Sequence, residues 1–470
     1  MGRKRNRVIE KAVIGDMAAE GKCVYKSDNK VIFVSHAAPG DVADLRIVRK
    51  KKSFEEAVIQ TLHTPSPIRL DPFCPEFGLC GGCKWQHIPY DKQIASKQQQ
   101  VVDALTRIGK LTLPEINPII GSEKNQYYRN KLEFTFTNQR WLTDEEIASS
   151  NEELSRDGAG FHIPGRFDKV LDIEECFLQD DLSNQIRNFV RDKAKELAIP
   201  FYNLSKHTGV LRNLIIRNTN KGHWMVILCI TELTKEVKSI LEELGDKYLK
   251  INSLNYVINT KKNDTIFDLE IVCTKGQAYI EEDMEGLNFR IGPKSFFQTN
   301  SEQALILYQK TREFAAIKEG DVVYDLYTGT GTIANFVAKL AKKVVGIEYV
   351  EMAIADAKVN SQINGIDNTS FYAGDMKDIF TSEFIAENGK PNVIITDPPR
   401  AGMHKDVVEQ LLMISAPRIV YVSCNASTQA RDLELLSEKY TITKVQPVDM
   451  FPHTHHVENI VLLELTQNME

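Results

Sequence analysis

The chain has 470 residues, of which 42% are hydrophobic and 26% charged, which is typical of a globular protein with about two to four domains. Its formal net charge of −6 argues against a uniformly basic nucleic-acid-binding protein. No run reaches the roughly 18 apolar residues of a membrane span, and the start, MGRKRNRVIE, lacks the apolar core of a secretion signal. We therefore expect a cytoplasmic protein without membrane contact, and no obligate protein partner is evident.

Residues 1–62 are predicted to form a small β-barrel. Short alternating segments are separated by turn signals at Ser27-Asp28-Asn29 and Pro39-Gly40-Asp41. Residues 1–60 hold 13 Lys and Arg against 8 Asp and Glu, so this part carries +5 and the remainder −11. Such a basic module on an acidic body favours contact with a polyanion, although a solubilising basic face would give the same balance. Four prolines in HTPSPIRLDPFCP then predict a linker.

Residues 63–285 are predicted to form an α+β domain. A helix is expected over 86–110, strands and helices mix from about 125 onward, and the polar stretch 138–160 is expected to be a loop. Cys74, Cys80 and Cys83 follow a C-x5-C-x2-C spacing, with Cys176 as a possible fourth thiol. In a reducing compartment such a group favours a metal site or a catalytic role over disulfides. Four thiols suit a 4Fe–4S cluster or a structural zinc site, whereas the spacing differs from the usual radical-SAM signature.

Residues 286–470 are predicted to form the third domain. From about residue 301 helices and strands alternate, which predicts a Rossmann-like, doubly wound parallel sheet that ends in antiparallel strands. In YDLYTGTGTIA a strand runs into a glycine loop and a helix, and Gly329 and Gly331 would let a ligand approach the backbone. Glu348 ends the next strand, where a carboxylate can accept hydrogen bonds from a ribose. At this point NAD and S-adenosylmethionine (SAM) both fit.

Two later strands end in reactive side chains. IITDPPRAG places Asp397, and VYVSCNAST places Cys424, at the same predicted sheet edge as the glycine loop. A lone Cys is often a small buried hydrophobe, but at this edge a thiolate could attack carbon 6 of a pyrimidine before carbon 5 is methylated from SAM. Glu458 in HTHHVENIVLLEL is the candidate base that then removes the proton from carbon 5, although a Glu that opens a strand is more often solvated surface.

Together these motifs resemble the RumA/TrmA family of RNA 5-methyluridine methyltransferases, and more closely its 23S ribosomal RNA branch. The resemblance covers nearly the whole chain and implies a TRAM-like RNA-binding domain, with CPEFGLCGGCKWQH as the cluster motif. It implies three sets of site residues: Cys74, Cys80, Cys83 and Cys176 as 4Fe–4S ligands; Gln298, Tyr327, Gly329, Glu348, Asp375 and Asp397 as SAM contacts; Cys424 as nucleophile and Glu458 as base.

Two departures concern the RNA target. The family often has Pro where this chain has Ala426, and the DPPRAG turn is that of the transfer-RNA branch. The expected function is therefore SAM-dependent methylation of carbon 5 of a uridine, with 23S rRNA as the expected substrate and tRNA as the alternative. Methylation of cytosine, a cluster-bearing RNA-binding protein without activity, and an NAD enzyme are the remaining hypotheses.

Overall fold

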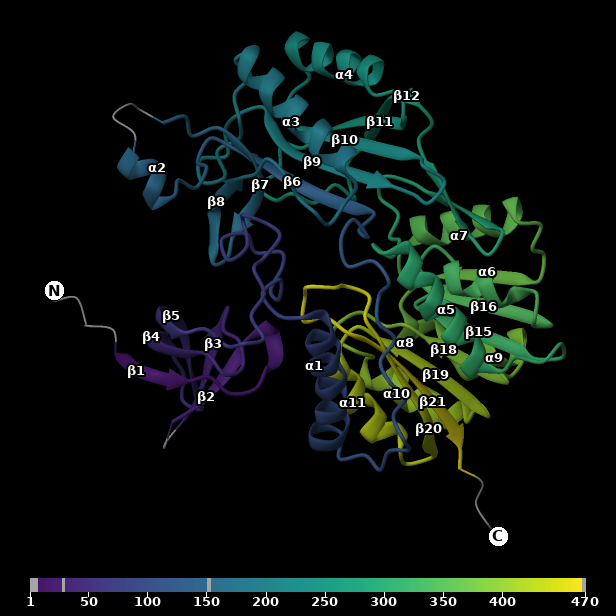
Figure 1. Cartoon of the computed structure of the whole chain (residues 1–470). Coiled ribbons are helices and arrows are strands. Elements are labelled where there is room, and N and C mark those ends of the chain that lie inside the picture. Colours follow the sequence, from purple (N-terminus) through teal and green to yellow (C-terminus); the bar gives the residue numbers. More distant parts are fainter. Residues whose placement is uncertain (1–6, 28–29, 150–153, 467–470) are drawn as a thin grey trace.

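The computed structural model describes residues 7–27, 30–149 and 154–466, arranged around three large sheets and one two-stranded sheet (Figure 1). The basic residues within 1–6, and Asp28 and Asn29 of an expected turn, lie outside these ranges. Within them, every helix is too short or too polar to cross a bilayer.

The N-terminal sheet has five strands in the order β1-β4-β5-β3-β2. They are β1 (Val8–Val13), β2 (Cys23–Lys26), β3 (Val31–Ser35), β4 (Val42–Lys50) and β5 (Phe54–Thr64). Their alternating side chains bury one apolar face, which includes Ile32, Val34 and Leu45. Because β1 and β2 lie at opposite edges, the sheet is an open half-barrel rather than the expected barrel.

The central sheet has seven strands in the order β12-β11-β10-β9-β6-β7-β8, and only β10 and β11 of these neighbours run parallel. The strands are β6 (Lys131–Thr137), β7 (Gly158–Ile163), β8 (Arg166–Asp172), β9 (Leu211–Asn218), β10 (Trp224–Ile230), β11 (Ile251–Ile258) and β12 (Ile271–Gly276). Helices α3 (Asp181–Glu196) and α4 (Lys235–Lys247) pack together beside it. The polar stretch expected as a loop contains the short helix α2 (Asp144–Ser149) and the start of β7.

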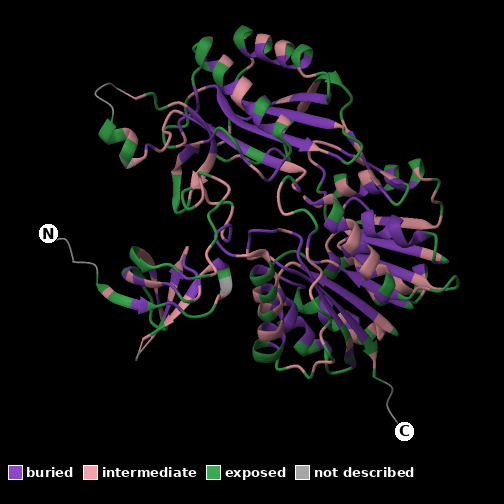
Figure 2. Ribbon diagram, viewed as in Figure 1, coloured by how far each residue is buried: buried purple, intermediate pink, exposed green. Residues whose placement is uncertain are grey.

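The C-terminal sheet has the order β17-β16-β15-β18-β19-β21-β20 and is parallel except for β21, as predicted. Its strands are β15 (Val322–Leu326), β16 (Lys343–Glu348), β17 (Thr369–Ala373), β18 (Val393–Thr396), β19 (Arg418–Ser423), β20 (Tyr440–Val448) and β21 (Glu458–Leu465). The hairpin β13 (Ile280–Met284) and β14 (Leu287–Ile291) precedes it. The helices are α5 (Ser301–Ala315), α6 (Thr332–Ala338), α7 (Glu351–Ile363), α8 (Met376–Ile379), α9 (Ser382–Asn388), α10 (Lys405–Ile414) and α11 (Ala426–Leu436). Its central strands are buried (Figure 2) because helices cover both faces.

Helix α1 (Tyr90–Asp103), which continues as a π-turn over Ala104–Ile108, packs on this C-terminal sheet against α11 and β20. Val101 and Leu105 are fully buried in the same core cluster as β19 and β21. The chain then runs along β20, where Asn117 N donates to Val445 O. The segment from 90 to about 120 therefore packs with the C-terminal sheet, although the sequence boundaries put it in the central domain.

Candidate active site

The glycine loop after β15 has a backbone that leaves room for a ligand. Tyr327, Gly329 and Gly331 have φ values of 63°, 55° and 74°, in the left-handed region. A Cβ on Gly331 would lie 2.8 Å from Ala357 Cβ, so this glycine is required for packing. A Cβ on Gly329 would meet no atom within 4 Å, so its backbone faces open space.

Two carboxylates fix this loop. Asp325, at the end of β15, accepts hydrogen bonds from Thr328 Oγ1 and from the backbone of α6, and burial raises its pKa to about 7. Glu348, at the tip of β16, accepts from Gly329 N at 3.2 Å and from Val350 N at 3.0 Å. The predicted ribose-binding Glu348 therefore lies directly against the glycine loop.

A cavity of about 270 Å³ opens beside the loop and is lined by Tyr327, Tyr349, Asp375 and Pro399, among others. Two predicted cofactor contacts, Tyr327 and Asp375, are thus brought together. An aromatic ring and a carboxylate are groups that can contact a nucleoside by stacking and hydrogen bonding. Tyr349, which is 72% exposed, adds a second ring that the sequence analysis did not single out.

Gln298 lies just before α5, and its position depends on two other segments. Its backbone oxygen accepts from Asn130 Nδ2 at 2.9 Å, and its side chain lies near Tyr308. Tyr308 is buried on α5, and burial together with the charge of Asp397 raises its pKa. Nothing in the sequence distinguishes Tyr308 from an ordinary core residue of an amphipathic helix.

Asp397 and Cys424 follow the ends of β18 and β19, and Glu458 opens the antiparallel β21, so the three side chains gather at the carboxyl edge of the parallel strands. Burial raises the pKa of Asp397 to about 7, and burial together with the charge of Asp397 raises the pKa of Glu458 to about 8. Burial and the carboxylates of Glu458 and Asp397 raise the pKa of the Cys424 thiol to about 11, while Arg400 acts in the opposite direction. These acidic groups therefore compete for ionisation, and Arg400 favours the charged forms.

Hydrogen bonds connect the loop after β18 to the loop after β19. Asn425 Nδ2 and Thr428 Oγ1 both donate to Arg400 O, at 3.0 and 3.1 Å. The buried Asp432 carboxylate accepts from Met403 N at 2.8 Å. The loop after Asp397 and the loop carrying Cys424 are thus fixed to each other. Sequence reasoning did not assign roles to Arg400 or Asp432; the position of Arg400 directly after Asp-Pro-Pro was the available signal.

The four predicted cluster ligands, Cys74, Cys80, Cys83 and Cys176, line one cavity of about 480 Å³ that also reaches Arg400. They come from the segment between β5 and α1 and from the loop between β8 and α3. However, among the residues that the structure describes, no group of three or more His, Cys, Asp or Glu side chains is arranged to hold a metal ion. The fold therefore brings the thiols to one cavity without forming a complete ligand set.

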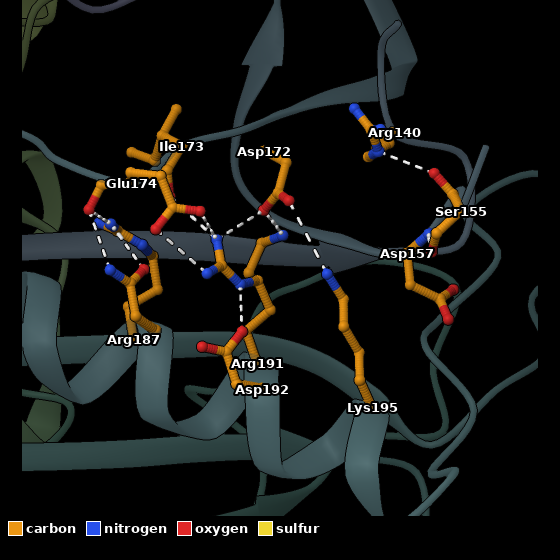
Figure 3. A network of polar contacts seen from close by, with 12 residues as sticks. Arg140, Ser155, Asp157, Asp172, Ile173, Glu174, Arg187, Arg191, Asp192 and Lys195 are labelled. Carbon is orange, nitrogen blue, oxygen red and sulfur yellow. Dashed lines mark hydrogen bonds and ion pairs between the residues drawn. The ribbon is translucent and has the colours of Figure 1, made fainter. Parts of the chain in front are cut away.

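A polar network fixes the loop that carries Cys176, and Figure 3 shows its part around Glu174, Arg187 and Arg191. Asn184 Oδ1 accepts from Cys176 N at 2.8 Å and from Arg187 Nη1 at 3.0 Å. Arg187 Nη2 also donates to Glu174 O at 2.6 Å, and Arg191 pairs with the Glu174 carboxylate at 2.7 Å. The fully buried Arg187 guanidinium, near the Cys176 sulfur, favours its thiolate, although burial itself raises the thiol pKa.

Comparison with known proteins gives a consistent result. The model of the tRNA (uracil-5-)-methyltransferase family matches residues 216–466, more than half of the chain. An uncharacterized RNA methyltransferase of Bacteroides thetaiotaomicron is 58% identical over 454 residues, covering 96% of this chain and 100% of that relative. One of Chlorobaculum tepidum is 38% identical over 470 residues, covering 98% and 97% of the two chains.

A solved structure agrees over the whole length. The tRNA (uracil-54, C5)-methyltransferase of Pyrococcus abyssi, in complex with S-adenosyl-L-homocysteine, superposes with a TM-score of 0.73 at 28% identity and covers 96% of this chain and 100% of that one. The resemblance read from the motifs is thereby confirmed at the level of the family. The chain belongs to the tRNA (uracil-5-)-methyltransferase family, of RumA/TrmA type, and is a SAM-dependent RNA methyltransferase.

Proposed function

We propose that this protein methylates carbon 5 of a uridine in 23S rRNA, with Cys424 as nucleophile and Glu458 as base. The proposal rests mainly on one observation: the Cys424 thiol lies close to the buried, weakly acidic carboxyl of Glu458 at the sheet edge that carries the glycine loop. Bound SAM supplies an electrophilic methyl group. The open space at Gly329 and the cavity beside Tyr327 fit such a ligand, which Gln298, Glu348, Asp375 and Asp397 would also contact.

The residues act in sequence on a uridine flipped into the site. The Cys424 thiolate bonds to carbon 6, and the electrons of the C5=C6 double bond move onto oxygen 4 as an enolate. Carbon 5 then takes the methyl group. Glu458 removes the remaining proton from carbon 5, the double bond re-forms, and the S–C6 bond breaks to release the thiolate. Arg400, which favours the Cys424 thiolate, supports the first step.

The N-terminal half-barrel, proposed to be a TRAM-like domain, would bind RNA phosphates through its lysines and arginines. Lys50, Lys51 and Lys52 are exposed at the end of β4 and in the turn after it. Such contacts contribute affinity and orientation, and the chemistry takes place at the edge of the C-terminal sheet.

We also propose that Cys74, Cys80, Cys83 and Cys176 hold a 4Fe–4S cluster with no catalytic step of its own. Their shared cavity and the positive charge of Arg187 support this, since thiolates are the iron ligands. The thiols are not arranged as a metal site, so the 74–83 segment would have to close around the cluster. Zinc is the alternative for the same ligands.

A tRNA substrate is the second candidate. It is supported by the DPPRAG turn and by the likeness to the Pyrococcus abyssi enzyme, which is a tRNA (uracil-54, C5)-methyltransferase. Mapping 5-methyluridine in the rRNA and tRNA of a deletion strain separates the two, because the lost modification identifies the substrate. Loss from tRNA alone would contradict the 23S assignment.

The nucleophile is tested with Cys424→Ala, which should bind SAM but neither methylate RNA nor form a covalent adduct. Cys273→Ala, at a half-buried thiol on β12, is the matched control and should retain activity. Methylation by the Cys424 variant would overturn the proposed chemistry.

A further inference from the structure

The loop of residues 449–457 leads directly to Glu458 and is held from outside its own sheet. The Lys97 ammonium on α1 pairs with Asp449 Oδ1 at 2.6 Å, and both side chains have 0% exposure. Lys97 Nζ also donates to Phe451 O at 3.0 Å, and Tyr90 OH donates to Asp449 Oδ2 at 2.8 Å. Three hydrogen bonds from α1 thus fix the first residues of this loop.

Gln93, one turn before Lys97 on the same face of α1, holds the middle of the loop. Its Oε1 accepts from His453 N at 2.9 Å, while its Nε2 donates to Trp85 O at 3.0 Å and to Ile88 O at 2.8 Å. Lys84 N and Trp85 N in turn donate to His453 O at 2.7 and 3.1 Å. Gln93 therefore connects the loop before Glu458 to the segment that follows the cysteine motif.

The backbone at this contact is strained. His453 has a φ of 62°, a left-handed conformation that is uncommon for residues other than glycine and persists only where the surroundings impose it. A buried Lys–Asp pair also costs desolvation and is often no more stabilising than apolar side chains of similar volume. A gain in stability therefore does not explain these buried polar contacts. Hydrogen bonds are directional, however, so the contacts select one conformation of the loop.

We infer that Gln93 and Lys97 are positioning residues for the proton-removal step, which they serve by fixing the 449–457 loop so that Glu458 faces the base bound to Cys424. This rests on the proposed function, in which Glu458 takes the proton from carbon 5 after methyl transfer. Bond formation by Cys424 and methyl transfer precede that step and do not depend on the loop. Loosening the loop should therefore slow release of the methylated RNA without slowing methylation.

The test uses two variants that loosen the loop differently. Lys97→Met combined with Asp449→Asn removes both charges, so no unpaired buried ion remains. Gln93→Met leaves the Lys97–Asp449 ion pair intact. If the double variant does not fold, this single variant alone tests whether loosening the loop slows release of the methylated RNA. Gln98→Met is the matched control, because Gln98 lies on the same helix but accepts from Ile119 N and not from a residue of the Glu458 loop.

Single-turnover methylation, denaturant-stable protein–RNA adduct and SAM affinity are measured for each variant, with Glu458→Gln as the reference. Release is expected to slow by about 10- to 100-fold, because a displacement of about 1 Å at a reacting group has effects of this size. The adduct should accumulate in the loop variants and in the Glu458 variant, and not in the Gln98 control, while SAM affinity stays unchanged.

Four results would overturn the inference. Folded, SAM-binding loop variants that turn over normally without adduct show that the contacts do not position Glu458. Equal losses in methylation and release show a general structural role. If Glu458→Gln itself traps no RNA, the assignment of the base fails, and the inference falls with it; trapping by Glu458→Gln alone refutes the inference and leaves the proposed function standing.

Discussion

Glu458→Gln should stabilise the protein while it blocks product release. Glu458 is 4% exposed, and burial together with the charge of Asp397 raises its pKa from 4.5 to about 8. Between these two pH values the carboxyl is ionised in the unfolded chain and protonated in the folded one. The folded state therefore takes up a proton and loses relative stability as the pH rises from 4.5 to about 8.

The size of the effect follows from proton linkage. A raised pKa of this magnitude lowers the free energy of unfolding by about 4 kcal/mol at pH 8 and by about 1 kcal/mol at pH 5. Glutamine of nearly the same volume carries no charge at any pH, so the variant avoids the cost. The gain should thus appear as a rise of several degrees in the unfolding midpoint at pH 8, and as a much smaller one at pH 5.

The assay is thermal unfolding of wild type and variant without RNA, at several values between pH 5 and 8. Glu464→Gln, an exposed position on the same strand, is the control and should leave the midpoint unchanged at every pH. An unchanged or lower midpoint for Glu458→Gln at pH 8, with no pH dependence of the difference, would refute the argument that Glu458 is a desolvated carboxyl.

Asp397→Asn should shift the pH dependence of Cys424 alkylation toward lower pH, because it removes a negative charge that raises the thiol pKa; no shift would mean that the two groups do not interact. Replacing Lys50, Lys51 and Lys52 by Ala should weaken RNA binding and flatten its salt dependence by up to about 0.9 per lost phosphate contact, and an unchanged slope would remove the N-terminal sheet from the RNA interface. Anaerobically purified protein should be brown, with absorption near ~400 nm from a cysteine-ligated cluster, whereas colourless protein with stoichiometric zinc would contradict the cluster.

The sequence by itself determined the C-terminal sheet and much of its edge. Strand, glycine loop and helix follow one another in YDLYTGTGTIA, and each later parallel strand ends in its own polar residue. Because parallel strands joined by helices finish at one edge, Asp397 and Cys424 could be placed near the glycine loop from local patterns alone. The same reasoning predicted that the N-terminal module is built of short strands, but not whether their sheet closes, since that depends on pairing between its two edges.

Only the tertiary structure decided the contacts between distant segments. Lys97 and Asp449 are 352 residues apart, and the alternation of apolar and polar residues along α1 does not reveal that this helix packs on β20. The same holds for Tyr308, which a helical pattern presents as an ordinary core residue. Periodicity reports which face of an element is buried, but not which other element covers that face. The packing of the whole chain decides this, and it therefore also decides the pKa shifts that burial causes in Glu458 and Cys424.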